Sequence, residues 1–498
     1  MIPLGLTEQL PALQVMVPLL ASVLCAIVRQ RQICAAITVA TSVAMPVIAF
    51  ALLTEVQANG PISYAMGGWA PPVGIEYYID TTNAFLLVLV ALMGAAVSLY
   101  APRSIAVEIR PEAQGWYYSM YLMCMTGLLG MAITGDAFNV FVFMEISSLA
   151  MYTLIALGSE RRALVAAFQY LIIGTLGATF YVIGVGLIFT MTGSLNLYDI
   201  STLIWDSEHV RPVIAGLAFI TVGFGLKLAM FPLHLWLPNA YAFAPTVATA
   251  FIASTATKVA VYLLLRFLFS VFGVDYTFSL VPTAEVLMVL AALGMIVPSF
   301  SAIFQENVKR MLAYSSVSQV GYMLMGSALA SEAGLTGSIS HLMNQAIIKS
   351  CLFLAVGIMF FSTGATRMEN LAGIGRTMPF TMAAFVIAGL GLIGVPSTAG
   401  FVSKWYLIQG AVEAEAWLLV AVIVISSAMA ILYIGRVIEV AYFREPSSKV
   451  VRKPGLEMML VVWALVAAII FFGVQTELTA GIAGEAALEL LAGYGERG

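Results

Sequence analysis

Four lysines lie inside segments that are otherwise apolar enough to cross a lipid bilayer: Lys227, Lys258, Lys349 and Lys404. A charged side chain at the centre of a membrane costs roughly 2.5–3.5 kcal/mol on insertion scales, so such residues are rare unless they have a function. Glu145, in the apolar run FNVFVFMEISSLAMY, adds the opposite charge. This combination of buried acid and bases indicates a set of groups that hold and pass protons.

Glu145 needs a cationic partner, because an ionised carboxylate in an apolar segment otherwise takes up a proton. Lys227, in the run GFGLKLAMFPLHLWLP, is the candidate. At a separation of about 4 Å and an effective dielectric of about 20, such a pair is worth roughly 4 kcal/mol. Making and breaking the pair would therefore switch the lysine between its charged and neutral forms. The alternative is a static ion pair that only orients two helices.

The remaining buried bases are predicted to continue this series. Lys258 lies in FIASTATKVAVYLLL beside hydroxyl residues that can hold water, and His341, Gln345 and Lys349 recur four residues apart, on one ridge of a helix. Histidine titrates near neutral pH, which suits a proton path, although a packed core histidine is the alternative. Lys404 is predicted to be the terminal site. For Lys258 and Lys404 the alternative is a side chain that snorkels to the membrane interface.

Two apolar segments carry glycine and proline in corresponding places. GFGLKLAMFPLHLWLP contains Pro232 and Pro238, and GLGLIGVPSTAGFVSKW contains Pro396. Proline removes a backbone donor and frees a carbonyl, which is tolerated at membrane depth only inside protein or beside water. Such paired interruptions indicate broken helices around a mid-membrane site; for Pro396 a simple kink is the alternative. His234, beside the first break, is predicted either to relay protons or to bond to the broken backbone.

The composition places these residues in a polytopic membrane protein with an all-α fold. Of 498 residues 61% are hydrophobic and 10% are charged, against about 25% charged in a soluble domain, and the mean hydropathy is +0.99. A span needs about 20 apolar residues. We count fourteen spans, centred near residues 18, 43, 90, 125, 147, 177, 222, 256, 290, 320, 350, 388, 427 and 465. No linker divides the chain, so we expect one integral membrane domain over residues 1–498.

Lysine and arginine alternate between loops as the positive-inside rule requires. One set of loops is mainly acidic and holds three bases: Arg211, Arg266 and Arg497. The other set holds fourteen: Arg29, Arg31, Arg103, Arg110, Arg161, Arg162, Lys309, Arg310, Arg367, Arg376, Arg444, Lys449, Arg452 and Lys453. This asymmetry supports the span count and predicts that both termini lie outside. Glu8 is the only early charge, unlike the basic start of a signal peptide, so we expect the first span to be retained.

Other chemistries find little support in the sequence. Its cysteines, Cys25, Cys34, Cys124 and Cys351, lie in or beside apolar spans without CxxC spacing, so we expect core packing and neither a metal site nor disulfides. There is no Gly-rich phosphate loop, HExxH motif or nucleophile elbow. We therefore expect a transporter subunit with no cofactor, no metal and no nucleic-acid partner, or else the pump subunit of a redox enzyme.

Four runs resemble the proton-translocating antiporter-like subunits of respiratory complex I and of multisubunit Mrp-type cation/proton antiporters: FNVFVFMEISSLAMYTLI, GFGLKLAMFPLHLWLPNAYAFAPTVATAFIASTATKVAVY, KRMLAYSSVSQVGYM and GVPSTAGFVSKW. The similarity covers nearly the whole chain. It implies two inverted five-helix repeats, each with a broken helix, which we expect at residues 116–271 and 280–440. It also implies a mid-membrane proton pathway through Glu145, Lys227, Lys258, His341, Lys349 and Lys404.

The resemblance further implies a complex in a bacterial plasma (inner) membrane, with sister membrane subunits as partners and H⁺ and Na⁺ as the transported ions. Some complex I subunits have glutamate where this chain has Lys404, and the largest members extend further, whereas this chain stops at Gly498. Size and lysine pattern favour the D subunits of Mrp-type antiporters. Subunits of complex I or of a membrane-bound hydrogenase are the alternative, and a third hypothesis is a structural subunit whose charges only stabilise assembly. The sequence shows no all-oxygen Na⁺ cage, although Asp136 with Asn139 would suit part of one.

Overall fold

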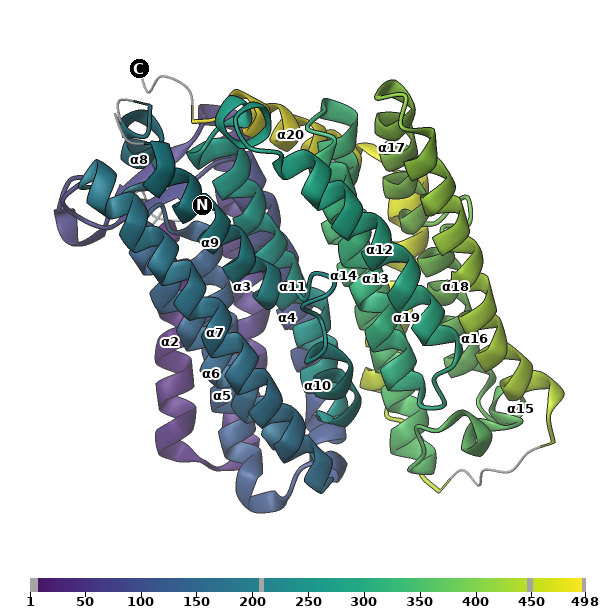
Figure 1. Cartoon of the computed structure of the whole chain (residues 1–498). Helices are drawn as coiled ribbons and strands as arrows, with labels where there is room; N and C mark the ends of the chain where they lie inside the picture. The colour runs from purple at the N-terminus through teal and green to yellow at the C-terminus, as the bar shows by residue number, and fades with distance from the viewer. Residues whose placement is uncertain (1–7, 206–209, 446–450, 495–498) are drawn as a thin grey trace.

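The computed structural model describes residues 8–205, 210–445 and 451–494, and nearly all of them are helical. The long helices run side by side between the two ends of the molecule (Figure 1). The first half contains α2 (Leu10–Val28), α3 (Arg31–Asn59), β1 (Ile62–Ala65), β2 (Glu76–Ile79), α4 (Thr81–Glu108), α5 (Gln114–Ile133), α6 (Ala137–Ala156), α7 (Arg161–Thr192), α8 (Leu197–Leu203), α9 (Val210–Lys227), α10 (Leu237–Phe243) and α11 (Thr246–Leu265). The second half contains α12 (Thr283–Ile303), α13 (Val308–Ala328), α14 (Glu332–Thr363), α15 (Ile374–Thr377), α16 (Pro379–Ile393), α17 (Ala399–Glu413), α18 (Trp417–Phe443), α19 (Leu456–Val474) and α20 (Ile482–Ala492).

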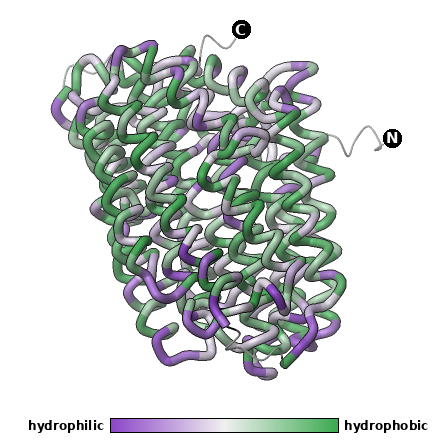
Figure 2. The backbone as a smooth tube through the Cα atoms, turned by 90° about the vertical axis from the view of Figure 1, so that its right-hand side faces the viewer, coloured by the Kyte–Doolittle hydropathy of each residue, from purple (hydrophilic) through white to green (hydrophobic). Residues whose placement is uncertain are grey.

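The predicted membrane class is confirmed, since each of the fourteen predicted span centres falls within a helix. Hydrophilic residues gather mainly at the two ends of the bundle, with hydrophobic residues between them (Figure 2). In the described part of the chain, eleven helices are long and apolar enough to cross a membrane, or twelve if the bent pair Met368–Thr377 and Pro379–Ile393 is one span. The helices α5 and α13 are not among them, although they have 20 and 21 residues. The count of fourteen spans therefore stays a prediction.

Both expected helix breaks are present. The helix α9 ends at Lys227, and the chain turns through Pro232 before α10 begins with Pro238 in its first turn. In the second half, α16 ends at Ile393 and α17 begins at Ala399, with Pro396 between them. Each break lies inside one of the two expected repeats, whose boundaries stay a prediction.

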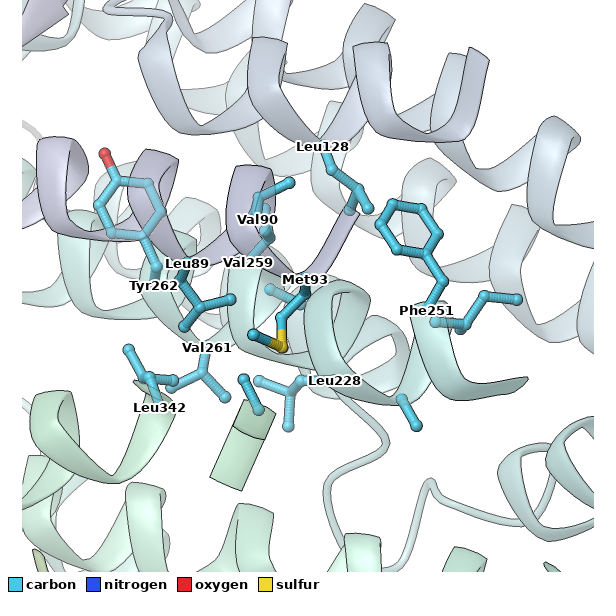
Figure 3. Packing of buried hydrophobic residues seen from close by; sticks show 14 of the residues in the cluster. Leu89, Val90, Met93, Leu128, Leu228, Phe251, Val259, Val261, Tyr262 and Leu342 are labelled. Carbon is cyan, nitrogen blue, oxygen red and sulfur yellow. The ribbon is translucent and has the colours of Figure 1, made fainter. Parts of the chain in front are cut away.

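The most deeply buried helices lie at the centre of the bundle. In 18-residue stretches of α11 and α14, 94% and 83% of the residues are buried, against 39% in the peripheral helices α2 and α12. Figure 3 shows how this core packs: Val261 of α11 lies between Met93 of α4 and Leu342 of α14. Because α11 and α14 carry Lys258 and Lys349, these two charges lie where both lipid and bulk water are excluded. The four cysteines are buried free thiols, as expected for core packing.

The two ends of the bundle differ in charge. We call the basic face the end that contains Arg31, which donates to the Pro102 carbonyl (3.0 Å), and Asn307, which pairs with Arg367. The opposite end is the acidic face, across which α20 lies (Figure 1). Two residues used in the sequence charge count, Lys449 and Arg497, lie outside the described residues.

Candidate proton-conducting site

The ion pair expected from the sequence is present at the first helix break. Lys227 is the last residue of α9, and its Nζ lies 3.6 Å from Oε1 of Glu145, in the middle of α6. The same ammonium donates to the hydroxyl of Ser148, at 2.6 Å. The lysine side chain is 6% exposed and the glutamate side chain 25%. A cation also suits this position because the carbonyl end of a helix carries partial negative charge. Lys227 therefore has one charged and one neutral partner.

A small cavity connects this pair with the central helix. It measures about 20 Å³ and is lined by Lys227 and Ser148 together with Ala256 and Ala260 of α11. A single water needs about 10–15 Å³, so the cavity is large enough for one water. Ala256 and Ala260 are two residues before and two residues after Lys258, so they lie on the opposite side of α11 from the Lys258 side chain. The cavity therefore reaches the surface of α11 but not the Lys258 ammonium.

Lys258 is buried among neutral groups. Its ammonium donates to the carbonyl of Ala253 (2.5 Å) and to the hydroxyl of Thr257 (3.4 Å). The residue is 3% exposed, so the interpretation as a snorkelling lysine is wrong. Within the described residues no carboxylate lies within 4 Å of it. An unpaired charge in a low-dielectric interior is costly, which makes this lysine a site able to give up its proton.

His341, Gln345 and Lys349 form one ridge of α14. Hydroxyl and amide groups of the neighbouring helices bind the two bases of this ridge. His341 lies between α17 and α13: its Nδ1 is 2.7 Å from the Ser403 hydroxyl, and its Nε2 is 3.0 Å from Oε1 of Gln319. Because an amide oxygen only accepts, Nε2 donates to Gln319; in the neutral imidazole Nδ1 then accepts from Ser403, and in the protonated one it donates to Ser403. Lys349 donates to the Ser315 hydroxyl at 2.5 Å. Both bases are fully buried, and both are held by neutral groups.

Lys404 is held at the second break much as Lys227 is held at the first. Its ammonium donates to the last carbonyls of α16, those of Leu392 (3.1 Å) and Ile393 (2.8 Å), and to the hydroxyl of Ser427 (3.0 Å). It also lies 4.9 Å from the centre of the Tyr322 ring. The residue is 5% exposed and borders a cavity of about 330 Å³. The snorkelling alternative is therefore wrong for this lysine too.

These bases form one electrostatic cluster. Lys258 of α11 and Lys404 of α17 both act electrostatically on His341 and on Lys349 of α14. Gln345, on the same ridge, has a buried amide with no hydrogen-bond partner among the described residues. A buried polar group without a protein partner marks a place where water binds. The arrangement is suited to proton transfer through polar groups and small cavities.

Three further expected residues, His234, Asp136 and Asn139, have roles that stay predictions. His234 is 6% exposed inside the first break and stacks on Phe231 with ring centres 5.4 Å apart. Its Nδ1 has no hydrogen-bond partner in the described part of the chain, so its relay role stays a prediction. Asp136 accepts from the Asn139 amide at 2.7 Å as the N-cap of α6, and both line a cavity of about 680 Å³ on the acidic face. A Na⁺ role for this pair also stays a prediction.

Some buried charges at the ends of helices were not expected from the sequence. Lys309 and Arg266 were counted as loop residues, which is wrong: each is 4% exposed and lies in or directly beyond a helix. Arg266 forms a two-bond ion pair with Asp80, at 2.6 and 2.7 Å. Glu108, at the end of α4, is 7% exposed and was not among the predicted site residues. Flanking arginines and prolines make these positions resemble loops, and no pattern in the sequence indicates their burial.

Comparison with known proteins gives consistent matches. A family described as NADH:quinone oxidoreductase/Mrp antiporter, TM, matches residues 134–430. NADH-quinone oxidoreductase subunit N of Desulforudis audaxviator is 43% identical over 442 residues, which are 88% of this chain and 87% of that protein. Among the D subunits of Na⁺/H⁺ antiporters, that of Alkalihalophilus pseudofirmus is 30% identical over 380 residues, 76% of each chain.

Two solved complexes contain chains of the same fold. A chain of the membrane-bound sulfane sulfur reductase, an archaeal respiratory membrane complex, is 30% identical with a TM-score of 0.90, covering 97% of this chain and 98% of that one. A chain of the Mrp complex from Dietzia sp. is 26% identical with a TM-score of 0.88, covering 98% of both chains.

Proposed function

Because this chain belongs to the NADH:quinone oxidoreductase/Mrp antiporter family of membrane subunits, we propose that it is the proton-translocating subunit of a multisubunit Na⁺/H⁺ antiporter. The observation that carries the proposal is the contact between Lys227 and Glu145, 3.6 Å apart at a helix break. An ion pair at mid-membrane depth is a typical element of an ion pathway. Two relatives are D subunits of Na⁺/H⁺ antiporters, which supports Na⁺/H⁺ exchange as the activity of the assembly.

The pathway runs through neutral hydrogen-bonding groups from one base to the next. When Glu145 takes up a proton, Lys227 loses its charged partner and keeps its bond to Ser148. The lysine can then pass a proton towards α11, the helix that carries Lys258. From there the bases of α14 lead to Lys404 at the second break. Because each lysine donates to neutral oxygens, its hydrogen bonds do not require a fixed counter-charge.

The membrane context follows from the charge distribution and from the relatives. Lys and Arg gather in cytoplasmic loops, so the basic face is the inner side and both termini lie outside, in the inner membrane of a bacterium. The chain works with sister membrane subunits, because the similar solved chain from Dietzia belongs to an Mrp complex. H⁺ and Na⁺ are the ions that the assembly exchanges.

The second candidate function is a proton-pumping subunit of a redox enzyme. The observation that favours it is the 43% identity to an NADH-quinone oxidoreductase subunit N. In that case the same pathway is driven by electron transfer in partner subunits instead of by a cation gradient. Lysine at position 404 favours the antiporter, because some complex I subunits have glutamate at the corresponding position.

The test is cation-driven collapse of a preformed ΔpH in inside-out vesicles that contain the complete native assembly. Wild type is compared with Glu145→Ala and Lys227→Ala at matched protein levels. If Na⁺ collapses ΔpH in wild type and not in the variants, the proposal stands. If Na⁺ has no effect but NADH builds a ΔpH that the variants lack, the redox pump is correct. Variants that assemble and match wild type in both assays would show that the buried charges are structural.

A further inference from the structure

Glu108 and Lys309 are buried, opposite charges that the pathway above does not use. Glu108 ends α4 and is 7% exposed, while Lys309 lies in the first turn of α13 and is 4% exposed. Together with Glu160 they line a cavity of about 30 Å³ beside Ala244 and Pro245, the junction between α10 and α11. A water needs about 10–15 Å³, so this cavity can hold water between the charges.

Glu108 is fixed to the helix that carries Lys258. Its Oε1 accepts from the Ser104 hydroxyl at 2.5 Å, and its Oε2 accepts from the backbone N–H of Thr246 at 2.6 Å. Thr246 is the first residue of α11. Helix N-termini favour negative charge, which holds the carboxylate in place at the basic face, and among the described residues no cation lies within 4 Å of it.

Lys309 lines the same cavity as Glu108, but its ammonium does not contact the Glu108 carboxylate. Its ammonium donates to the carbonyl of Ala244 at 2.6 Å. In the described part of the chain no carboxylate oxygen lies within 4 Å of it, although Glu108 and Glu160 both act on it electrostatically. Arg452 borders the adjoining larger cavity, so Glu108 lies among charges of both signs.

A larger cavity leads from Glu108 to the surface of the basic face. It measures about 250 Å³ and is lined by Glu108, Ser159, Ser362 and Arg452, among others. Ser362 is 1% exposed, and its hydroxyl has no hydrogen-bond partner among the described residues. A buried hydroxyl of this kind on a polar cavity wall marks a position for ordered water. Water can therefore reach the carboxylate from the basic face.

We propose that Glu108 is the proton-collecting group of the basic face, which takes protons from water in the larger cavity and passes them along the start of α11 to Lys258. The inference rests on the proposed function and assigns the entry to its proton pathway. In the transfer, a hydronium ion gives one proton to the carboxylate and leaves as water. The carboxylic acid then gives that proton, through bound water, to the neutral amine of Lys258, and the carboxylate is restored.

Buried polar groups are available along this route. The hydroxyl of Thr246 is fully buried and has no hydrogen-bond partner among the described residues. Farther along, Tyr241 of α10 is buried and lies near Thr257, the neighbour of Lys258. These hydroxyl groups lie at the two ends of the proposed route, one beside the carboxylate and one beside the neighbour of Lys258.

The charged and titratable surroundings of Glu108 come from several elements. Lys309 of α13 and Glu160 before α7 share the smaller cavity, and Arg452 borders the larger one. Tyr100 of α4 and Tyr117 of α5 lie within electrostatic range of the carboxylate. Tyr100 donates its hydroxyl to the Leu354 carbonyl at 3.1 Å instead of to Glu108. The carboxylate thus remains the group best placed to exchange protons with the cavity.

The experiment measures proton flux of the complete assembly in inside-out vesicles, where the medium contacts the basic face. Wild type is compared with Glu108→Gln, Glu108→Asp and the matched control Glu112→Gln, an exposed acid in the next turn of chain. Glu145→Gln reports on the proposed function itself. Flux is divided by the amount of assembled complex and is measured from mildly acidic to alkaline medium. The flux is driven by Na⁺ or by an electron donor, whichever moves protons in wild type.

We expect Glu108→Gln to lower the flux at least about 10-fold in alkaline medium, where protons are scarce, and much less in acidic medium. Glu108→Asp should restore part of the flux, and Glu112→Gln should match wild type. If Glu145→Gln is inactive but Glu108→Gln matches Glu112→Gln at every pH, the inference is overturned and the proposed function stands. If Glu145→Gln keeps wild-type flux, the proposed function fails and the inference fails with it.

A measurement on wild type covers the case in which Glu108→Gln does not assemble. An apolar carbodiimide reacts with protonated buried carboxyl groups, and mass spectrometry locates the modified residue. We expect modification of Glu108 to increase as the medium is acidified and to remove flux in proportion to the modified fraction. Full modification of Glu108 with unchanged flux would overturn the inference.

Discussion

The ammonium nitrogen of Lys227 lies 3.6 Å from the carboxylate of Glu145, yet its shorter contact, 2.6 Å, is to the neutral hydroxyl of Ser148. The lysine therefore keeps a hydrogen bond whether or not the carboxylate is charged. The hydroxyl does not replace the lost counter-charge, so whether the pair breaks during transport or only orients α6 and α9 stays a prediction.

Ser148→Ala tests the importance of that second contact. A hydrogen bond to a charged group contributes about 1.5–3 kcal/mol, so proton flux should fall by about 10- to 100-fold if the bond is needed in the rate-limiting state. Ser147→Ala is the control, because the Ser147 hydroxyl donates within its own helix to the Met144 carbonyl. Flux is measured in vesicles at equal amounts of assembled complex. Equal rates for the two variants would contradict the role given to Ser148.

Gly400→Ala tests the geometry of the second helix break. A Cβ atom at Gly400 would clash with the carbonyl oxygen of Gly391, so α16 and α17 cannot keep their contact. We expect lower abundance of the assembly and loss of flux, since Lys404 depends on this contact for its carbonyl partners. Gly435→Ala on α18 is the matched control, as a Cβ there meets nothing within 4 Å. Thermal stability of the purified complex distinguishes the two variants, and similar midpoints would contradict the expectation.

The positions of the helices could be predicted from the sequence because long apolar runs have few stable alternatives in a bilayer. The same reasoning found Lys227 and Glu145, since each interrupts such a run. It failed for Lys309 and Glu108, which lie at the ends of apolar runs, where charges usually face water. Their burial arises from packing of the α10–α11 junction against α4 and α13, which a single sequence does not reveal.

The ion pair between Asp80 and Arg266 should act mainly on stability. It has two bonds, and the side chains are 7% and 5% exposed. Asp80 also accepts from the Asn83 amide at the start of α4. Removing one partner of such a pair typically costs about 3–5 kcal/mol, so Asp80→Ala should lower the thermal midpoint of the assembly. Glu439→Ala, which removes an exposed pair with Arg444, should change stability by no more than about 1 kcal/mol. Equal midpoints would contradict the prediction.

Docking of the C-terminal helix should depend on pH through Glu489. This residue of α20 accepts from the Thr81 hydroxyl at 2.5 Å and from the Thr82 amide at 3.3 Å, at the start of α4. Burial, and then the charge of Asp80, raise the pKa of Glu489 above its ordinary value of 4.5. A carboxyl group whose pKa is raised by docking stabilises the docked state below the undocked pKa, and this contribution is lost as the pH rises through the docked pKa. Docking should therefore weaken as the pH rises above 4.5.

Hydrogen exchange of residues 482–492, corrected for the intrinsic rate at each pH, measures this effect. Protection in wild type should fall as the pH rises, because the ionised carboxylate is disfavoured in its buried position. Glu489→Gln cannot ionise and should keep its protection across the range. Glu485→Gln, exposed on the same helix, should behave as wild type. If protection falls equally in Glu489→Gln, the pH dependence arises elsewhere, and Glu489 does not control how α20 is held on the acidic face.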